Sequence, residues 1–278
     1  MVSERGVSEP DLTGGVVSEP AVASGDGKAS AGLRQAWELL AEAARRRAMA
    51  WRRLSEAFYG PDEDWVDQLV SGAVEDDLRW ATSWLDANRE LYDPALLALH
   101  RYVELRAGVD APAVLEELAV DHARLFVGPE NPPASPYESV WTDVDPMSGK
   151  PIINGPSTIA VAAAYEELGL SQSPDHHDLP DHVATEAELL CFLCEREAAA
   201  WSEAEPDVAK ELRAAEQRFI TAHLGRFAGE LCAAVDAHGR ETCYAAFASF
   251  LLAHLTIESG TPYLDVVGSI WSSPGRKE

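Results

Sequence analysis

The amino-acid sequence predicts an all-α protein, built as a single globular bundle of about nine or ten helices with a proline-rich loop mid-chain. Apolar residues recur at helical spacing in one segment after another from Ala31 onward. Glycine and proline fall near the ends of these segments, which is typical of helix boundaries. No convincing alternation of apolar and polar residues indicates a strand, although residues 263–271 could be extended.

The first helix is predicted from Ala31 to about Gly60, because its apolar residues share helical spacing. Segment 110–128 has helix signals at both ends: Asp110 can cap it, Pro112 lies in its first turn, and Gly128 ends it. The remaining helices are predicted at these segments: 62–72, 76–87, 94–107, 156–170, 180–201, 205–236 and 240–259.

The chain is expected to contain one folded domain with a tail at each end. Residues 1–30 repeat "VSEP" and are rich in Gly, Ser, Glu and Val without helical or strand periodicity, which predicts a disordered leader. The helical domain is placed at residues 31–271, and residues 272–278 form a short tail. No repeat of 20 to 50 residues occurs, so a solenoid is not predicted.

The chain is strongly acidic, with a net charge of −25 and a pI of about 4.6. Such a field repels nucleic acid and anionic membranes, so neither is predicted as a partner. It would attract a cationic partner, but it equally fits a solubility or high-salt adaptation, and both interpretations stay open. The sequence lacks an apolar run long enough to span a membrane and a basic, apolar secretory signal, so a cytoplasmic protein is predicted.

The sequence contains none of the common catalytic or metal-binding motifs. Cys191 and Cys194 form a C-x-x-C, but it lies inside a helical run and no second pair completes a zinc site. Together with Cys232 and Cys243, they are interpreted as buried structural thiols. The run "DHHD" at 175–178 could be a metal cluster, but it is better explained as a polar loop in which Asp178 caps the next helix. No metal, no cofactor and no catalytic residue is therefore predicted.

Two segments are not explained by core packing. In "RLFVGPENPPASPYESVW", prolines fix the backbone, Tyr137 and Trp141 offer flat amphipathic surfaces, and the Glu138 carboxylate can pair with arginine. In "LPDHVATEAELLCFL", Asp181 lies in the first turn of a helix, where a negative charge is favourable.

These two segments and their spacing resemble the TorD/DmsD family of redox-enzyme maturation chaperones. Family members pair an L-F-x-G-P…P-Y-E-S-V loop with a P-D-H-x-x-x-E-L helix start in an all-helical chain, and the resemblance extends over about residues 33–260. The resemblance implies a chaperone whose client is the catalytic subunit of a dimethyl-sulfoxide-reductase-type molybdoenzyme. The chaperone would bind the twin-arginine leader of this subunit, or its apo-form. It would assist cofactor insertion and proofreading before export. The peptide-binding residues that it implies are Gly128, Pro129, Tyr137, Glu138, Ser139, Trp141, Asp181 and His182.

Two other functions stay open from the residues alone. One is a small helical enzyme using Asp181, His182 and Glu186 as acid and base, since His182 and Glu186 are four residues apart on one helix face. The other is a structural helical subunit of an oxidoreductase complex. The sequence also leaves open a monomer or a homodimer.

Overall fold

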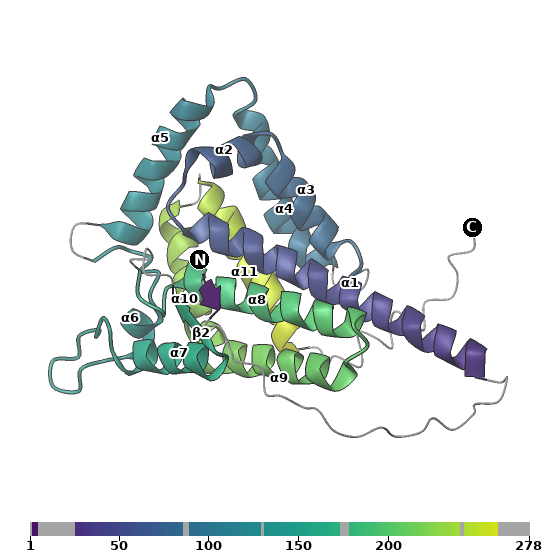
Figure 1. The fold of residues 1–278 in the computed structure, drawn as a ribbon. Helices are drawn as coiled ribbons and strands as arrows, with labels where there is room; N and C mark the ends of the chain where they lie inside the picture. The colour runs from purple at the N-terminus through teal and green to yellow at the C-terminus, as the bar shows by residue number, and fades with distance from the viewer. Residues whose placement is uncertain are drawn as a thin grey trace.

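The computed structural model of the chain describes residues 2–4, 26–85, 89–128, 131–172, 178–239 and 242–260, and it confirms the all-α prediction (Figure 1). The helices within these residues are α1 (Asp26–Phe58), α2 (Glu63–Val70), α3 (Ala73–Thr82), α4 (Arg89–Leu105), α5 (Ala111–His122), α6 (Glu138–Thr142), α7 (Pro156–Glu167), α8 (Val183–Ser202), α9 (Pro206–Ala222), α10 (Leu224–Gly239) and α11 (Cys243–Gly260), with a π-helical turn η1 (Ala123–Val127) after α5. None of these helices is long and apolar enough to cross a membrane.

The described helices begin where local chemistry favours a helix start. The Asp62 carboxylate accepts a hydrogen bond from the backbone N–H of Trp65 at 2.8 Å and so caps α2. Pro112, Pro156 and Pro206 lie in the first turns of α5, α7 and α9, where a missing N–H costs nothing. Asp110 occupies the N-cap position of α5 as predicted, but its side chain makes no capping hydrogen bond.

Two differences from the prediction raise the number of described helices to eleven. Segment 205–236 is two helices and not one, because His223 leaves the helical region with φ −129° and ψ −94°. The five-residue helix α6 forms inside the segment predicted as loop. Both differences arise from tertiary contacts of the candidate site, which a local pattern does not reveal.

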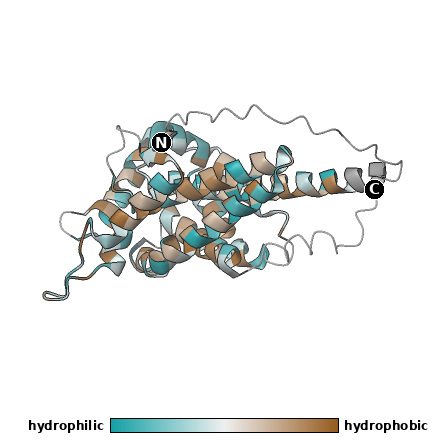
Figure 2. Ribbon diagram, turned by 60° about the horizontal axis from the view of Figure 1, so that its bottom comes forward, coloured by the Kyte–Doolittle hydropathy of each residue, from teal (hydrophilic) through white to brown (hydrophobic). Residues whose placement is uncertain are grey.

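The core forms where α1 and α8 pack side by side along their lengths, above α9 and in front of α11 (Figure 1). Trp51, Leu54 and Phe58 of α1 are at most 1% exposed and belong to one cluster with buried residues of α8, α10 and α11. Hydrophobic and hydrophilic residues alternate along the helices (Figure 2), as expected for helices with one buried face.

A buried ionic cluster lies inside this core. Arg47 of α1 contacts Glu197 of α8, and its guanidinium lies 3.5 Å from both Glu216 and Glu258. Arg213 of α9 contacts the same two carboxylates at 2.6 and 2.5 Å. Charged groups are tolerated in such an interior only when they are paired, so this cluster ties α1, α8, α9 and α11 together.

The predicted leader is only partly described. Val2–Glu4 form strand β1, antiparallel to β2 (Leu170–Gln172), and α1 begins at Asp26, before the predicted domain boundary. Residues 5–25 and the segment 261–278, with its predicted tail, lie outside the described residues. The domain boundaries therefore stay predictions.

Candidate functional site

The loop between η1 and α6 begins at a position that requires glycine. Gly128 has φ +49°, a conformation that residues with a Cβ rarely adopt. A Cβ built there would lie 3.1 Å from the backbone of Pro132, so the chain also passes too close for a larger residue. Its candidate neighbour Pro129 lies outside the described residues. Gly128 therefore serves the path of the loop.

The two segments singled out in the sequence are paired through their backbones. Tyr137 and His182 form an isolated antiparallel bridge. On either side of it, the Glu138 N–H donates to the Asp181 carbonyl at 2.9 Å, and the Val183 N–H donates to the Pro136 carbonyl at 2.8 Å. The end of the proline-rich loop and the start of α8 are thus one unit.

Asp181 lies at the centre of this unit and is fully buried. Its Oδ2 atom accepts a hydrogen bond from the Ser139 N–H at 2.9 Å, in the first turn of α6. Asp181 therefore satisfies an N–H at the start of α6 from outside that helix, while its Oδ1 atom has no hydrogen-bond partner. The prediction that Asp181 favours the start of α8 missed this link to the loop.

His182 caps α8 and is only 5% exposed. Its Nδ1 atom accepts a hydrogen bond from the Ala184 N–H at 3.1 Å. The imidazole stacks on Tyr59 of α1, with ring centroids 5.8 Å apart, and meets the edge of Tyr137 at 5.1 Å. The ring is therefore held between α1 and the loop.

Glu138 is buried and already paired within the chain. Its Oε2 atom accepts a hydrogen bond from His223 Nδ1 at 3.0 Å, and its Oε1 atom accepts one from Arg226 at 2.9 Å. The Glu138 side chain is 0% exposed, whereas that of Arg226 is 47% exposed. The carboxylate predicted to bind an arginine thus has an arginine of α10 beside it, and its contact with a peptide stays a prediction.

Glu186 is fully buried, and neither of its carboxyl oxygens has a hydrogen-bond partner. Burial, with the nearby negative charges of Glu138 and Asp181, raises the pKa of this carboxyl well above its ordinary value, although Arg226 acts in the opposite direction. The protonated form is therefore favoured, and Glu186 is sealed from any substrate in solution.

Two part-exposed members of the candidate site, Tyr137 and Trp141, are aromatic. The Tyr137 hydroxyl donates to Asp178 at 3.0 Å, and the indole N–H of Trp141 donates to the Ser135 carbonyl at 2.8 Å. Asp178 was predicted to cap α8, but His182 does so, and Asp178 accepts from Tyr137 instead. Tyr137 and Trp141 keep faces that another molecule can touch, in contrast to the buried Ser139.

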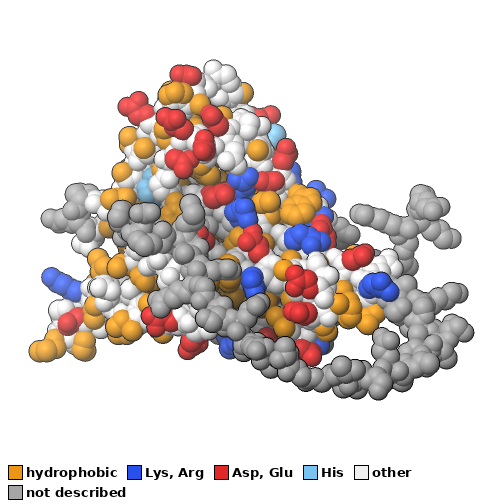
Figure 3. All heavy atoms as spheres, viewed as in Figure 1, with side chains coloured by type: hydrophobic (Ala, Val, Ile, Leu, Met, Phe, Trp, Pro, Cys, Tyr) orange, Lys and Arg blue, Asp and Glu red, His pale blue; other side chains and the backbone are white. Residues whose placement is uncertain are grey.

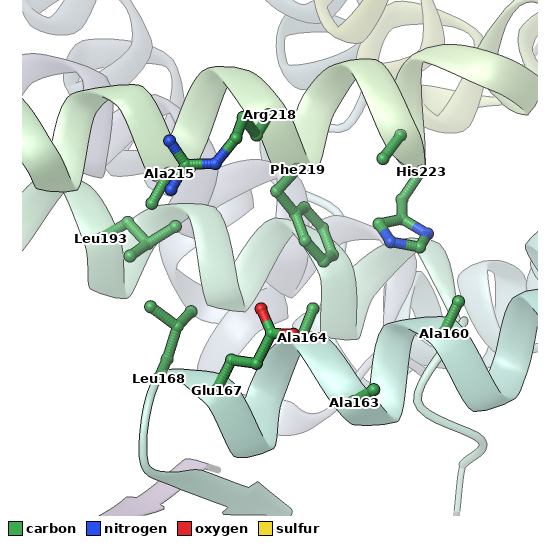
Figure 4. Close-up of a pocket in the computed structure, with 11 residues that line it drawn as sticks. Ala160, Ala163, Ala164, Glu167, Leu168, Leu193, Ala215, Arg218, Phe219 and His223 are labelled. Carbon is green, nitrogen blue, oxygen red and sulfur yellow. The ribbon is translucent and has the colours of Figure 1, made fainter.

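A cleft of about 430 Å³ lies between α7 and α9 beside this unit, and we call it the α7/α9 cleft (Figure 4). Phe219 and His223 extend from the end of α9 toward the alanines of α7, and Leu193 of α8 lines the other end of the cleft, near Ala215 and Leu168. Because His223 lines the cleft and also binds Glu138, one hydrogen bond connects the cleft to the end of the proline-rich segment. The α7/α9 cleft is therefore a continuation of the candidate site.

Sequence reasoning missed His223, Arg226 and the cleft. His223 lies within what reads as a long continuous helix, and only the nearby Gly225 suggests a break. Arg226 lies more than eighty residues from Glu138, so no local pattern could have paired the two.

The thiols and carboxylates of the described residues form no chemical centre. Cys191, Cys194, Cys232 and Cys243 are free and buried, as predicted. Burial raises the pKa of Cys191 and of Cys232 to about 12, so both are protonated thiols at neutral pH. The described part of the chain contains no group of His, Cys, Asp and Glu side chains that could hold a metal ion.

Comparison with known proteins gives one family match over this region and several related proteins. A family model described as nitrate reductase delta subunit matches residues 83–233, which include both motif segments and the α7/α9 cleft. The relatives are Tat proofreading chaperones DmsD from Salmonella paratyphi A, Salmonella typhimurium and Salmonella typhi, each 27% identical over 139 to 141 residues. These alignments cover 50% of this chain and 58 to 59% of each relative, so the chain spans less than two thirds of their length.

Proposed function

Because the chain belongs to the nitrate reductase delta subunit family, which confirms its resemblance to the TorD/DmsD family, we propose that it is a maturation chaperone for an exported redox enzyme. It binds the twin-arginine leader of the client's catalytic subunit in the cytoplasm, before export. The client is a molybdopterin enzyme of the dimethyl-sulfoxide-reductase type, and the bound leader delays export until the cofactor has been inserted.

One observation of the structure carries this proposal: the proline-rich loop and the start of α8 are locked into one unit that borders an open cleft. A pre-organised backbone loses little conformational entropy when a flexible peptide binds to it. The acidic chain, with carboxylates spread over the face that Figure 3 shows, attracts a leader that carries two arginines.

The residues of this unit divide into two roles under the proposal. Buried Asp181 and Glu138 hold the loop and His223 in place, and so act on the peptide through the shape that they maintain. Part-exposed Tyr137 and Trp141 contact the peptide directly. Gly128 supports the same surface through the path of the loop.

The acid–base alternative has no support in this geometry. Asp181, His182 and Glu186 lie close in sequence, but they are 0, 5 and 0% exposed, respectively. His182 uses one ring nitrogen to cap α8, and Glu186 has no hydrogen-bond partner to relay a proton. A chaperone requires no such chemistry.

Purification of the tagged chain from its own cytoplasm tests the function. We expect mass spectrometry to find an oxidoreductase catalytic subunit with a twin-arginine leader, and metal analysis to find less than one molybdenum per complex. Deleting that leader should remove most of the co-purified subunit, while deleting an equal length at its C-terminus should not. Co-purification only with the cofactor-loaded enzyme, or with no such subunit, would contradict the proposal.

A further inference from the structure

Helix α7 lies at the edge of the molecule (Figure 1), and its exposed face is apolar. Residues 156–165 contain no charged side chain. Ile159 is 68% exposed, and Ala160 and Ala163 are exposed beside the cleft. A helix that is apolar all round is normally buried, so this face is suited to being covered by another molecule.

The α7/α9 cleft provides an apolar floor beside that face. The ring of Phe219 and the side chain of Leu193 lie between the two helices (Figure 4). The volume of about 430 Å³ falls within the range of small binding sites, roughly 300–1,000 Å³. The cleft therefore accommodates a few side chains of a peptide and not a folded domain.

The end of α7 carries charges that oppose its own stability. Glu166 and Glu167 form the last two positions of the helix, and both are exposed. A helix C-terminus carries partial negative charge, so each carboxylate there is unfavourable by about 0.3–1 kcal/mol. Within the described residues neither has an ion-pair partner. A cation bound at this end would relieve the repulsion.

His223 adds a polar ring atom inside the cleft. The Glu138 carboxylate can only accept, so His223 Nδ1 donates to it, and Nε2 is left for another partner. The His223 side chain is 9% exposed, and no hydrogen bond within the described residues uses Nε2. Figure 4 shows the ring directed from α9 toward Ala160. A polar group of an occupant can pair with Nε2.

We propose that the α7/α9 cleft binds the part of a client leader where a basic residue adjoins an apolar run. This inference rests on the proposed function and names the surface that performs it. The basic side chain of the leader pairs with Glu167, and the apolar side chains of the leader pack against Phe219 and Leu193. Arg218, on the opposite wall, also has no ion-pair partner within the described residues and weakens the attraction for a cation.

The test measures fluorescence anisotropy of a labelled synthetic peptide with two consecutive arginines followed by eight leucines and alanines. Ala163→Trp fills the cleft from an exposed position, and we expect affinity to fall about tenfold or more. Ala113→Trp, at an exposed position of α5, is the matched control and should bind like wild type. Circular dichroism and a thermal melt verify that both variants fold.

Charge variants test the same surface without a change of shape. Removing both carboxylates with Glu166→Gln and Glu167→Gln should weaken binding about threefold to tenfold, whereas Glu90→Gln with Glu116→Gln should not. Arg218→Gln should strengthen binding. If wild type binds and all these variants bind equally, the cleft is not the site, although the function stands. If wild type does not bind the peptide, the proposed occupant of the cleft is wrong, and co-purification of the client decides separately whether the function stands.

Discussion

At the scale of single residues, Glu186 is the most exceptional group, because it is a fully buried carboxyl without a hydrogen-bond partner. Its pKa is raised by burial, and further by Glu138 and Asp181. Above about pH 4.5 the unfolded chain releases this proton while the folded chain keeps it. The folded state then binds more protons, so the free energy of unfolding falls as pH rises, until the folded pKa is passed.

We therefore expect Glu186→Gln to remove a pH dependence of stability. Between about pH 4.5 and the pKa of Glu186 in the folded chain, the free energy of unfolding of the wild type should fall by up to about 1.4 kcal/mol per pH unit relative to the variant. Urea unfolding of both proteins from pH 5 to pH 9 measures the difference, and Glu90→Gln on the surface is the control. Parallel curves for wild type and Glu186→Gln would show that the buried carboxyl is already ionised.

The cysteines give a second prediction at this scale. Since burial raises the pKa of Cys191 to about 12 and removes all four thiols from solvent, iodoacetamide at pH 8 should not modify the native protein. In urea the same reagent should add four groups, which mass spectrometry counts. Rapid modification of the native C-x-x-C would indicate a reactive site and contradict the structural assignment.

At the scale of the elements, the buried ionic cluster joins α1 to α8 inside the core. We expect Arg47→Met to lower the free energy of unfolding by about 3–5 kcal/mol, because Glu197 would lose its buried partner. Arg52→Met is the matched control on the same helix, since Arg52 and its partner Glu195 are 51 and 47% exposed. It should cost at most about 1 kcal/mol. Equal losses in urea unfolding would mean that the cluster contributes no more than a surface pair.

Most helices could be predicted from the sequence, because residues within each segment determine where the helix forms. Periodic apolar residues and first-turn prolines appear in the sequence and reappear as α5, α7 and α9. The break at His223 was not predictable, because the contact with Glu138 comes from a segment 85 residues away. The short helix α6 likewise depends on Asp181, which reaches it from the start of α8.

At the scale of the whole molecule, the fold brings the loop, the start of α8 and the α7/α9 cleft into one region. The two motif segments could be selected from the sequence because neither composition nor packing explained them. What the sequence concealed was burial: Glu138 and Asp181 look like exposed ligands in a loop and a first turn, yet both are fully buried. Their charges are therefore directed inward, and the accessible acidic group beside the cleft is Glu167.

The acidic surface gives a prediction for the molecule as a whole. If the net charge of −25 attracts the leader, raising the salt concentration should weaken binding of the two-arginine peptide. Anisotropy titrations at 50 and 300 mM salt measure this, with a peptide of the same apolar run but no arginine as control. Affinity for the arginine peptide that is independent of salt would exclude an electrostatic contribution.

Isothermal titration of the wild-type chain with a twin-arginine leader peptide tests the central claim most directly. We expect saturable binding of one peptide per chain, and weaker binding when both arginines are replaced by lysine, because lysine cannot make the two-pronged contact with a carboxylate. A peptide of the same composition in scrambled order should bind more weakly still. Absence of heat and of saturation with the native leader, for a chain that circular dichroism shows to be helical, would contradict the claim.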